Sequence, residues 1–306
     1  MKKWVVAGGI IVAHALSSSP VTAQATSATE RDLMRRMQDV RALEGYARRK
    51  SEKDAKEAAE ILQPPELSKK AKDRIRQLRI PSGADFEQYH KFLEQKQTGI
   101  IKIFPSYDCL SKNVIRLDGD CTKFVPDSSD FSFREMSYVH PLYHDVGFAR
   151  GELISDAFFA QGIIASLGDI PIADVTIDTP GVDFLASYQT DTTFEAARKT
   201  AKTFRTGMGG NFRYSSHVDA LPNTTYAFRI IAYDLANSLP PLSEERTLPE
   251  LKFLSLSQDK REDLTAVFRI IRIDDLGGLT IVWKELRRVP APKLRFGKGQ
   301  ALTDFK

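Results

Sequence analysis

The chain has 306 residues, of which 42% are hydrophobic and 27% are charged. These values are typical of a globular protein rather than a disordered, collagen-like or membrane-embedded one. Two cysteines are too few for a disulfide-rich miniprotein or a four-cysteine zinc module. The formal net charge is only +4, and acidic residues outnumber basic ones between 86 and 287. Because phosphate-backbone binding needs a concentrated basic face, this composition argues against a nucleic-acid partner.

Residues 1–25 have the three parts of a secretory signal peptide. Lys2 and Lys3 supply positive charge, residues 4–16 form an apolar stretch, and Ala23-Gln24-Ala25 is a small-x-small cleavage site. The apolar stretch is shorter than the ~20 residues that span a bilayer, so we expect cleavage after Ala25 rather than a retained anchor. No later stretch approaches spanning length. We therefore expect a mature chain without a transmembrane segment, located in the periplasm or secreted.

The two cysteines, Cys109 and Cys121, would then meet an oxidising compartment. Residues 113–117 between them have the pattern of a short strand. We expect a disulfide that closes this loop and stabilises the fold by roughly 3 kcal/mol. Two buried free thiols are the alternative interpretation.

Two parts of the mature chain differ in composition. Between Thr26 and Asp85 the single aromatic residue is Tyr46, whereas all eighteen phenylalanines come later. A core needs such bulky side chains, so the segment 26–97 is interpreted as a charged helical arm that precedes the folded domain. The arm either packs loosely on that domain with a solvated face, or binds a partner or a second copy.

Three helices are expected within the arm. Leu33, Met37 and Val40 follow a helical spacing in the first helix, which Pro64-Pro65 ends. The second helix is expected over 68–78. The third is expected over 84–97, with Ser82 as its N-cap.

The region 98–293 changes to a repeat of two residues, which is typical of half-buried strands. The clearest strands are expected at 224–232, 264–270 and 279–284, and a glycine-containing turn at 274–278 joins the last two into a hairpin. The first strand is expected at 99–104, and weaker strands are expected at 131–139, 151–154, 157–165, 173–177 and 211–217.

No long helix is expected between these strands, which favours an antiparallel β-sandwich or barrel preceded by the α-helical arm. Residues 235–263 contain two tandem prolines and many charges, and are interpreted as a surface excursion of this all-β domain. The basic tail, 294–306, is expected to be flexible.

Several short motifs resemble a set of exported bacterial proteins whose function is uncharacterised. The motifs are Thr98-Gly99-Ile100-Ile101, Leu167-Gly168-Asp169-Ile170-Pro171, Phe184-Leu185-Ala186-Ser187-Tyr188 and the hairpin region 266–290. The resemblance covers about residues 98–190 and 222–290. It implies a bacterial envelope setting and contributes no catalytic residues.

The densest group of potential metal ligands is His140-Pro141-Leu142-Tyr143-His144-Asp145. A loop that brings His140 and His144 together, with His217 completing the set, would hold a zinc-like divalent metal. Pro141 argues against the helix that would place the first two imidazoles on one face. The alternative interpretation is a pair of packing or surface histidines in a turn.

Two further segments contain residue types that are found in phosphate-binding loops or in catalytic triads. The glycine-rich segment 206–211 lacks the strand, the Lys-Ser/Thr pair and the helix of a phosphate-binding loop, so a plain loop is expected. Residues 215–219 include Ser, His and Asp, but adjacency in sequence is not the geometry of a catalytic triad. No catalytic residue is therefore assigned.

These observations favour an exported, non-enzymatic binding or structural component of the bacterial cell envelope that needs no cofactor. An envelope protein or a glycan is the expected class of partner, and the ligand and the oligomeric state stay open. The rival hypothesis is a metal-dependent hydrolase that uses His140, His144 and His217.

Overall fold

The structure is a computed structural model that describes residue 50 and residues 67–111, 114–234, 259–298 and 300. These residues belong, apart from residue 50, to a compact unit that begins at Ala58. The signal sequence, the first helix of the arm, most of the 235–263 excursion and the end of the tail lie outside the described residues.

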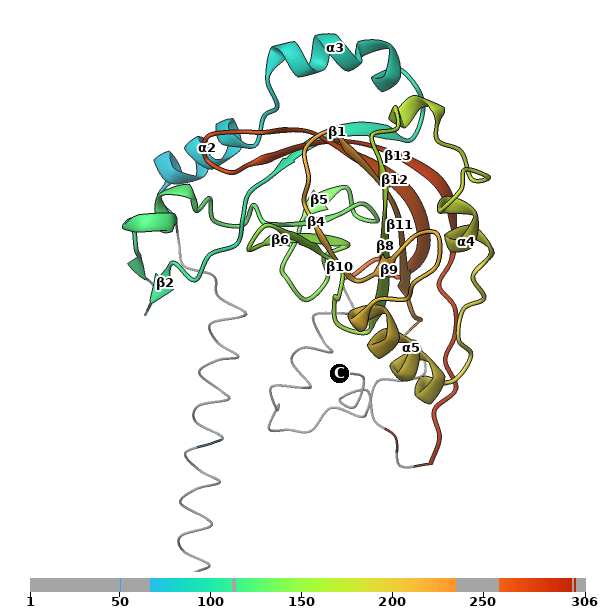
Figure 1. Ribbon diagram of the computed structural model, residues 1–306. Coiled ribbons are helices and arrows are strands. Elements are labelled where there is room, and N and C mark those ends of the chain that lie inside the picture. The colour runs from blue at the N-terminus through green and yellow to red at the C-terminus, as the bar shows by residue number, and fades with distance from the viewer. Residues whose placement is uncertain (1–49, 51–66, 112–113, 235–258, 299, 301–306) are drawn as a thin grey trace, which may run out of the picture. The chain divides into compact units, whose positions relative to one another are not determined.

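Two antiparallel sheets form the body of this unit (Figure 1). The larger has the strand order β1-β13-β12-β11-β8-β9, and the smaller has the order β10-β7-β6-β4-β5. The larger sheet contains β1 (Thr98–Ile103), β8 (Ala160–Gly168), β9 (Tyr214–Ser215), β11 (Thr224–Ala232), β12 (Glu262–Ile273) and β13 (Leu279–Pro290). The smaller contains β4 (Asp130–Ser132), β5 (Ser137–Tyr138), β6 (Val146–Ala149), β7 (Glu152–Ile154) and β10 (His217–Asp219). The expected sandwich-like β fold is confirmed.

Strand β11 is buried on both faces of the larger sheet. Phe228 and Ile230 belong to the core shared with the smaller sheet, whereas Ala227 and Ile231 belong to the core shared with the helices. Because side chains alternate along a strand, one alternating sequence supplies both cores. The larger sheet is thus the middle of three layers.

Two helices cover the second face of the larger sheet: α4 (Val182–Ser187) and α5 (Phe194–Thr206), which appear beside the sheet in Figure 1. The sequence interpretation missed both helices and was wrong to expect no long helix between the strands. The side-chain oxygen of Thr193 accepts from the backbone of Ala196, which caps α5. Phe194 and Phe204 then bury one face of the helix in the core.

The two described helices of the arm were both expected: α2 (Lys69–Leu78) begins after Ser68, and α3 (Gly83–Leu93) begins after Ser82 but ends before the expected end at Gln97. Ser82 and Asp85 form a capping box at the start of α3. Phe92 of α3 is buried in the core on the helix-covered face of the sheet. No described helix is long and apolar enough to cross a membrane.

Three of the weaker strand predictions need correction. The stretch 131–139 is a hairpin of β4 and β5, because the chain turns at Met136 with φ +55°. The stretch 173–177 is no strand and begins within a short 3-10 helix, η2 (Ile172–Asp174). The stretch 211–217 contributes to both sheets, with β9 ending before Ser216 and β10 starting after it.

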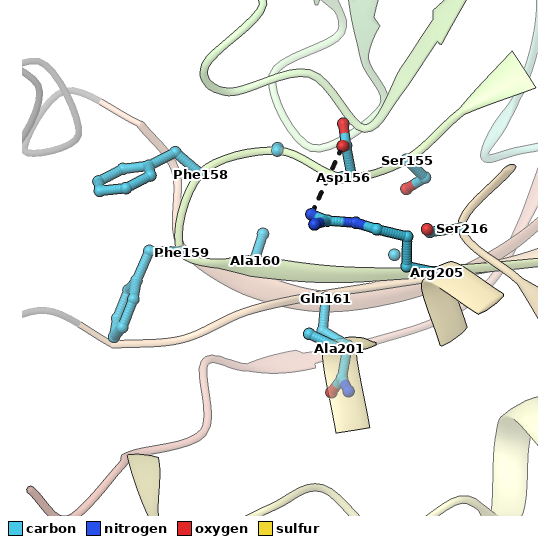
Figure 2. Close-up of a pocket in the computed structure, with 11 residues that line it drawn as sticks. Ser155, Asp156, Phe158, Phe159, Ala160, Gln161, Ala201, Arg205 and Ser216 are labelled. Atoms are coloured by element: carbon cyan, nitrogen blue, oxygen red, sulfur yellow. Dashed lines mark ion pairs between the residues drawn. The ribbon is translucent and has the colours of Figure 1, made fainter. Parts of the chain in front are cut away.

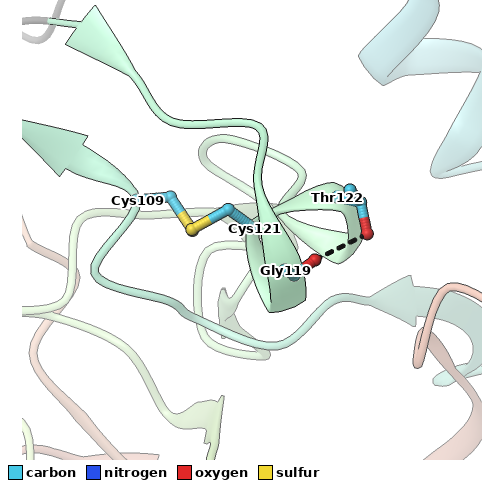
Figure 3. The surroundings of a disulfide bond; sticks show 4 residues. All are labelled: Cys109, Gly119, Cys121 and Thr122. Atoms are coloured by element: carbon cyan, nitrogen blue, oxygen red, sulfur yellow. Dashed lines mark hydrogen bonds between the residues drawn. A yellow bond between two sulfur atoms is a disulfide. The ribbon is translucent and has the colours of Figure 1, made fainter.

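The expected disulfide is present (Figure 3). It joins Cys109, next to the two-stranded ribbon β2 (Leu110–Ser111) and β3 (Val114–Ile115), to Cys121 in the 3-10 helix η1 (Gly119–Lys123). Cys109 is fully buried, and the Cα atoms of the pair lie 5.5 Å apart. The bond closes the loop that carries the β2–β3 ribbon.

Candidate functional site

The site lies where two segments of chain pass between the sheets side by side. Residues 155–159 lead from β7 to β8, and Ser216 leads from β9 to β10. The backbone N–H of Ser155 donates to the carbonyl of Ser216 over 2.8 Å, which ties the two crossings together. Gly162 on β8 makes room for them, since a Cβ there would lie 1.7 Å from Oγ of Ser155.

Asp156, on the first crossing, has three basic side chains around its carboxylate. Nε2 of His144 lies 3.9 Å from Oδ1, and Nε2 of His217 lies 3.7 Å from Oδ2. Nη2 of Arg205, in the last turn of α5, lies 3.8 Å from Oδ2. The Asp156 side chain is 35% exposed, so this charged group faces both the protein interior and solvent.

A second carboxylate stands behind each imidazole. Nδ1 of His144 lies 3.0 Å from Oδ1 of Asp130 on β4, and Nδ1 of His217 lies 3.8 Å from Oε2 of Glu152 on β7. Gly147 leaves space for the first pair, because a Cβ there would lie 2.9 Å from Asp130 Oδ1. Each histidine is thus held between two acidic side chains from different segments.

His144 is nearly fully buried, and its surroundings decide its charge. Burial alone would lower the pKa of His144, but hydrogen bonding and charge from Asp130, together with the charges of Asp156 and Asp145, outweigh it. The net result is that the pKa of His144 is raised above its ordinary value of 6.5. A proton on this imidazole is therefore stabilised within the fold.

Beside Asp156 lies a small cavity of about 30 Å³, whose walls include Ser155, Arg205 and Ser216 (Figure 2). Asp156 and Arg205 face each other, and the two serines lie to one side of them. The buried hydroxyl oxygens of both serines, and Nε2 of His144 and of His217, make no hydrogen bond within the described residues. Since buried polar atoms are normally paired, this cluster of four indicates a place for bound water or a ligand group.

The cavity adjoins an open groove of about 520 Å³, with which it shares Asp156 and Arg205. Every residue that lines the groove is polar or charged: Glu152, Asp156, Arg205, Arg213, Ser215 and His217. The volume lies within the range of small-molecule sites, whereas the absence of apolar residues from the lining differs from most of them. We call this set of six residues the polar groove.

The structure brings together two of the three histidines that the sequence singled out. His144 and His217 share Asp156, whereas Nδ1 of His140 accepts a hydrogen bond from the backbone of Leu142, and its ring lies against Tyr143. The segment from His140 to His144 is a turn, in line with the argument from Pro141.

A search of the described residues finds no group of three or more His, Cys, Asp or Glu side chains arranged to hold a metal ion. The two imidazoles approach different oxygens of Asp156, at distances longer than the roughly 3.0–3.4 Å between neighbouring ligands on a zinc ion. The zinc-like site therefore stays a prediction from the sequence, to which the described geometry adds no third ligand.

Sequence reasoning missed Asp156, Arg205 and Arg213. Asp156 is an isolated acidic residue between Ser155 and Ala157, and it belongs to no recognisable sequence motif. Arg205 could have been found through α5, because Thr193 followed by alanines, lysines and arginines is a signal for a capped helix.

Comparison of the chain with protein-family models, with curated proteins and with solved structures finds no match.

Proposed function

We propose that the chain is an exported, non-enzymatic binding component of the bacterial cell envelope, and that the polar groove takes its ligand. The observation that carries the proposal is the groove beside Asp156, close to which four buried polar atoms make no hydrogen bond with any described residue. Such atoms are costly to bury without partners, so an occupant that hydrogen-bonds to them gains free energy.

The arrangement of the side chains favours binding over catalysis. A nucleophilic hydroxyl needs a base within hydrogen-bonding distance, yet the hydroxyls of Ser155 and Ser216 have no such partner among the described residues. The Nε2 atoms of His144 and His217 both face Asp156. In a catalytic base, this nitrogen would instead face the nucleophilic hydroxyl. The groups are therefore placed to hold a polar molecule.

Export is supported by the Cys109–Cys121 disulfide, because such bonds persist in oxidising compartments. The signal-like composition of residues 1–25 and the resemblance to exported bacterial proteins agree with it. Expression of the full chain in a bacterium tests this part. We expect the protein in the extracytoplasmic fraction with Thr26 as its first residue, and recovery of the uncleaved chain in the cytoplasm would contradict it.

The binding function is tested with the protein purified natively from that fraction and then denatured to release bound small molecules for mass spectrometry. We expect a compound that the wild type and Lys202→Gln retain and that Arg205→Gln loses. Lys202 is an exposed residue of the same helix that does not line the groove, so it controls for the loss of a positive charge. An identical set of released compounds from all three proteins would contradict the proposal.

A further inference from the structure

The polar groove carries charges of both signs in one small space, and this points to a class of ligand. We infer that the groove binds a small zwitterion of the class of the free α-amino acids, with its carboxylate on Arg205 and Arg213 and its ammonium on Glu152 and Asp156. This inference rests on the proposed binding function and goes beyond it by naming the ligand chemistry.

The glycine-rich segment 206–211 explains how the second arginine reaches the groove. Gly207 ends α5 with φ +89°, a conformation that favours glycine. The chain then turns back, and Met208 and Tyr214 exchange two backbone hydrogen bonds of 2.8 and 2.9 Å. A Cβ at Gly207 would lie 2.6 Å from Nε of Arg213, so glycine leaves space for that side chain. The loop thus returns Arg213 to the groove that Arg205 lines.

The positive side of the groove is formed by the guanidinium groups of Arg205 and Arg213. The guanidinium of Arg213 donates to the carbonyl of Thr206 over 3.3 Å, and it makes no ion pair with a carboxylate within the described residues. Among the described residues, the guanidinium of Arg205 contacts the Asp156 carboxylate at 3.8 Å. Guanidinium groups bind carboxylates through two parallel hydrogen bonds, so this pair provides a site for a ligand carboxylate.

The negative side is formed by Glu152 and Asp156, which lie on two sides of His217. The Glu152 carboxylate is 3.8 Å from Nδ1 of His217, and the Asp156 carboxylate is 3.7 Å from Nε2. Both carboxylate side chains are partly exposed, at 49% and 35%, so a ligand ammonium can reach them from solvent. Two carboxylates provide the oxygen acceptors that an ammonium group with three donors requires.

A ligand with one charge is a poorer fit to this lining. A simple anion would approach the arginines and the two carboxylates together, and a simple cation would meet the same conflict with the signs exchanged. An apolar ligand would meet charged groups around the groove, and only the aliphatic parts of the same polar side chains could pack against it. A zwitterion places each of its ends on the opposite charge, and the groove of about 520 Å³ accommodates a molecule of that size.

Isothermal titration calorimetry of the mature protein tests the inference with glycine, L-serine and D-serine. The comparison compounds are acetate and methylammonium, each with one charge, and N-acetylglucosamine, a neutral sugar. We expect saturable binding of at least one zwitterion and none of the singly charged compounds. Arg213→Gln and Glu152→Gln should each weaken that binding about tenfold or more, because each removes a charge-assisted hydrogen bond. Lys202→Gln should leave it unchanged.

The other outcomes separate this inference from the proposed function. If only N-acetylglucosamine or acetate bound, and Arg213→Gln weakened that binding, the inference of a zwitterionic ligand would be wrong. The proposal that the groove is a binding site would still be supported. Zwitterion binding that survives both groove variants would place the ligand elsewhere and overturn the inference. Binding of no compound of any class would contradict the inference and weigh against the proposed function as well.

Discussion

Arg229 on β11 and Asp263 on β12 form a two-point ion pair inside the protein. Nε and Nη2 of Arg229 donate to the two carboxylate oxygens over 2.8 and 2.6 Å. Nη1 of the same arginine donates to the carbonyls of Leu185 and Tyr188, at the end of α4, over 2.6 and 2.7 Å. Arg229 thus attaches a helix to the central sheet and satisfies backbone carbonyls that the helix leaves unpaired.

Replacing Arg229 by Met should lower the free energy of unfolding by about 3–5 kcal/mol, because it leaves Asp263 as a buried charge without its partner. Urea denaturation measures the change. The matched control is Arg76→Gln, which removes an arginine that is 77% exposed and paired with Asp73 on the surface. That control should cost no more than about 1 kcal/mol. Equal losses for the two variants would contradict the role given to Arg229.

Gly162 is expected to tolerate no side chain. A Cβ at this position would lie 1.7 Å from Oγ and 2.2 Å from the carbonyl oxygen of Ser155, so Gly162→Ala must displace the crossing that carries Asp156. We expect a loss of several kcal/mol in urea denaturation, as for severe overpacking. Gly83→Ala is the control, because nothing lies within 4 Å of its added Cβ in the first turn of α3. It should be neutral or slightly stabilising.

The disulfide should stabilise the fold mainly through the unfolded chain. Replacing both Cys109 and Cys121 by Ser is expected to lower the free energy of unfolding by roughly 3 kcal/mol, since the unfolded chain regains the freedom of the closed loop. Thermal or urea denaturation with and without a reductant measures the effect. The reductant should destabilise the wild type and leave the double variant unchanged. A wild type insensitive to complete reduction would contradict this account.

His144 should make stability depend on pH. Because its pKa is raised in the folded state, protonated His144 stabilises the fold fully below its ordinary pKa of 6.5. This contribution is lost as the pH rises through the folded-state value. The stability of the wild type relative to His144→Gln should therefore be larger at about pH 5.5 than at about pH 8.5. A pH-independent difference would contradict the surroundings described for this imidazole.

The control for the pH experiment is His90→Gln on α3. The side chain of His90 is 64% exposed and lies 3.4 Å from the Glu94 carboxylate. Solvent screens such a surface pair, so this variant should follow the wild type at both pH values within about 0.5 kcal/mol. A comparable pH effect at His90 would show that the stability change does not report on the buried site.

The sequence predicted the β fold wherever one local pattern dominated. The hairpin of β12 and β13 was found because alternation runs along both strands and glycines mark the turn. The prediction of one strand over 211–217 was wrong, because a single period-two pattern does not reveal that the chain crosses from one sheet to the other at Ser216. Helix α5 was missed although its sequence carries helix signals: Thr193 caps it, and an amphipathic run of alanines, lysines and arginines follows.

Only part of the candidate site could be predicted from the sequence, namely its histidines. His144 and His217 attract attention as rare residue types, whereas Asp156 and Arg205 are common ones without a motif. Their proximity depends on where β7 leads into β8 and where α5 ends, which are properties of the topology. Pairings between residues so far apart in the chain leave no periodic signal in a single sequence.

The most direct test of the account is elemental analysis of the mature protein, purified from the extracytoplasmic fraction without chelator or nickel resin. We propose that the histidines beside Asp156 belong to the ligand-binding polar groove rather than to a metal-dependent hydrolase. The account predicts far less than one equivalent of zinc or any other transition metal, in the wild type and in the His144→Ala/His217→Ala variant alike. About one equivalent in the wild type, lost in that variant, would contradict it.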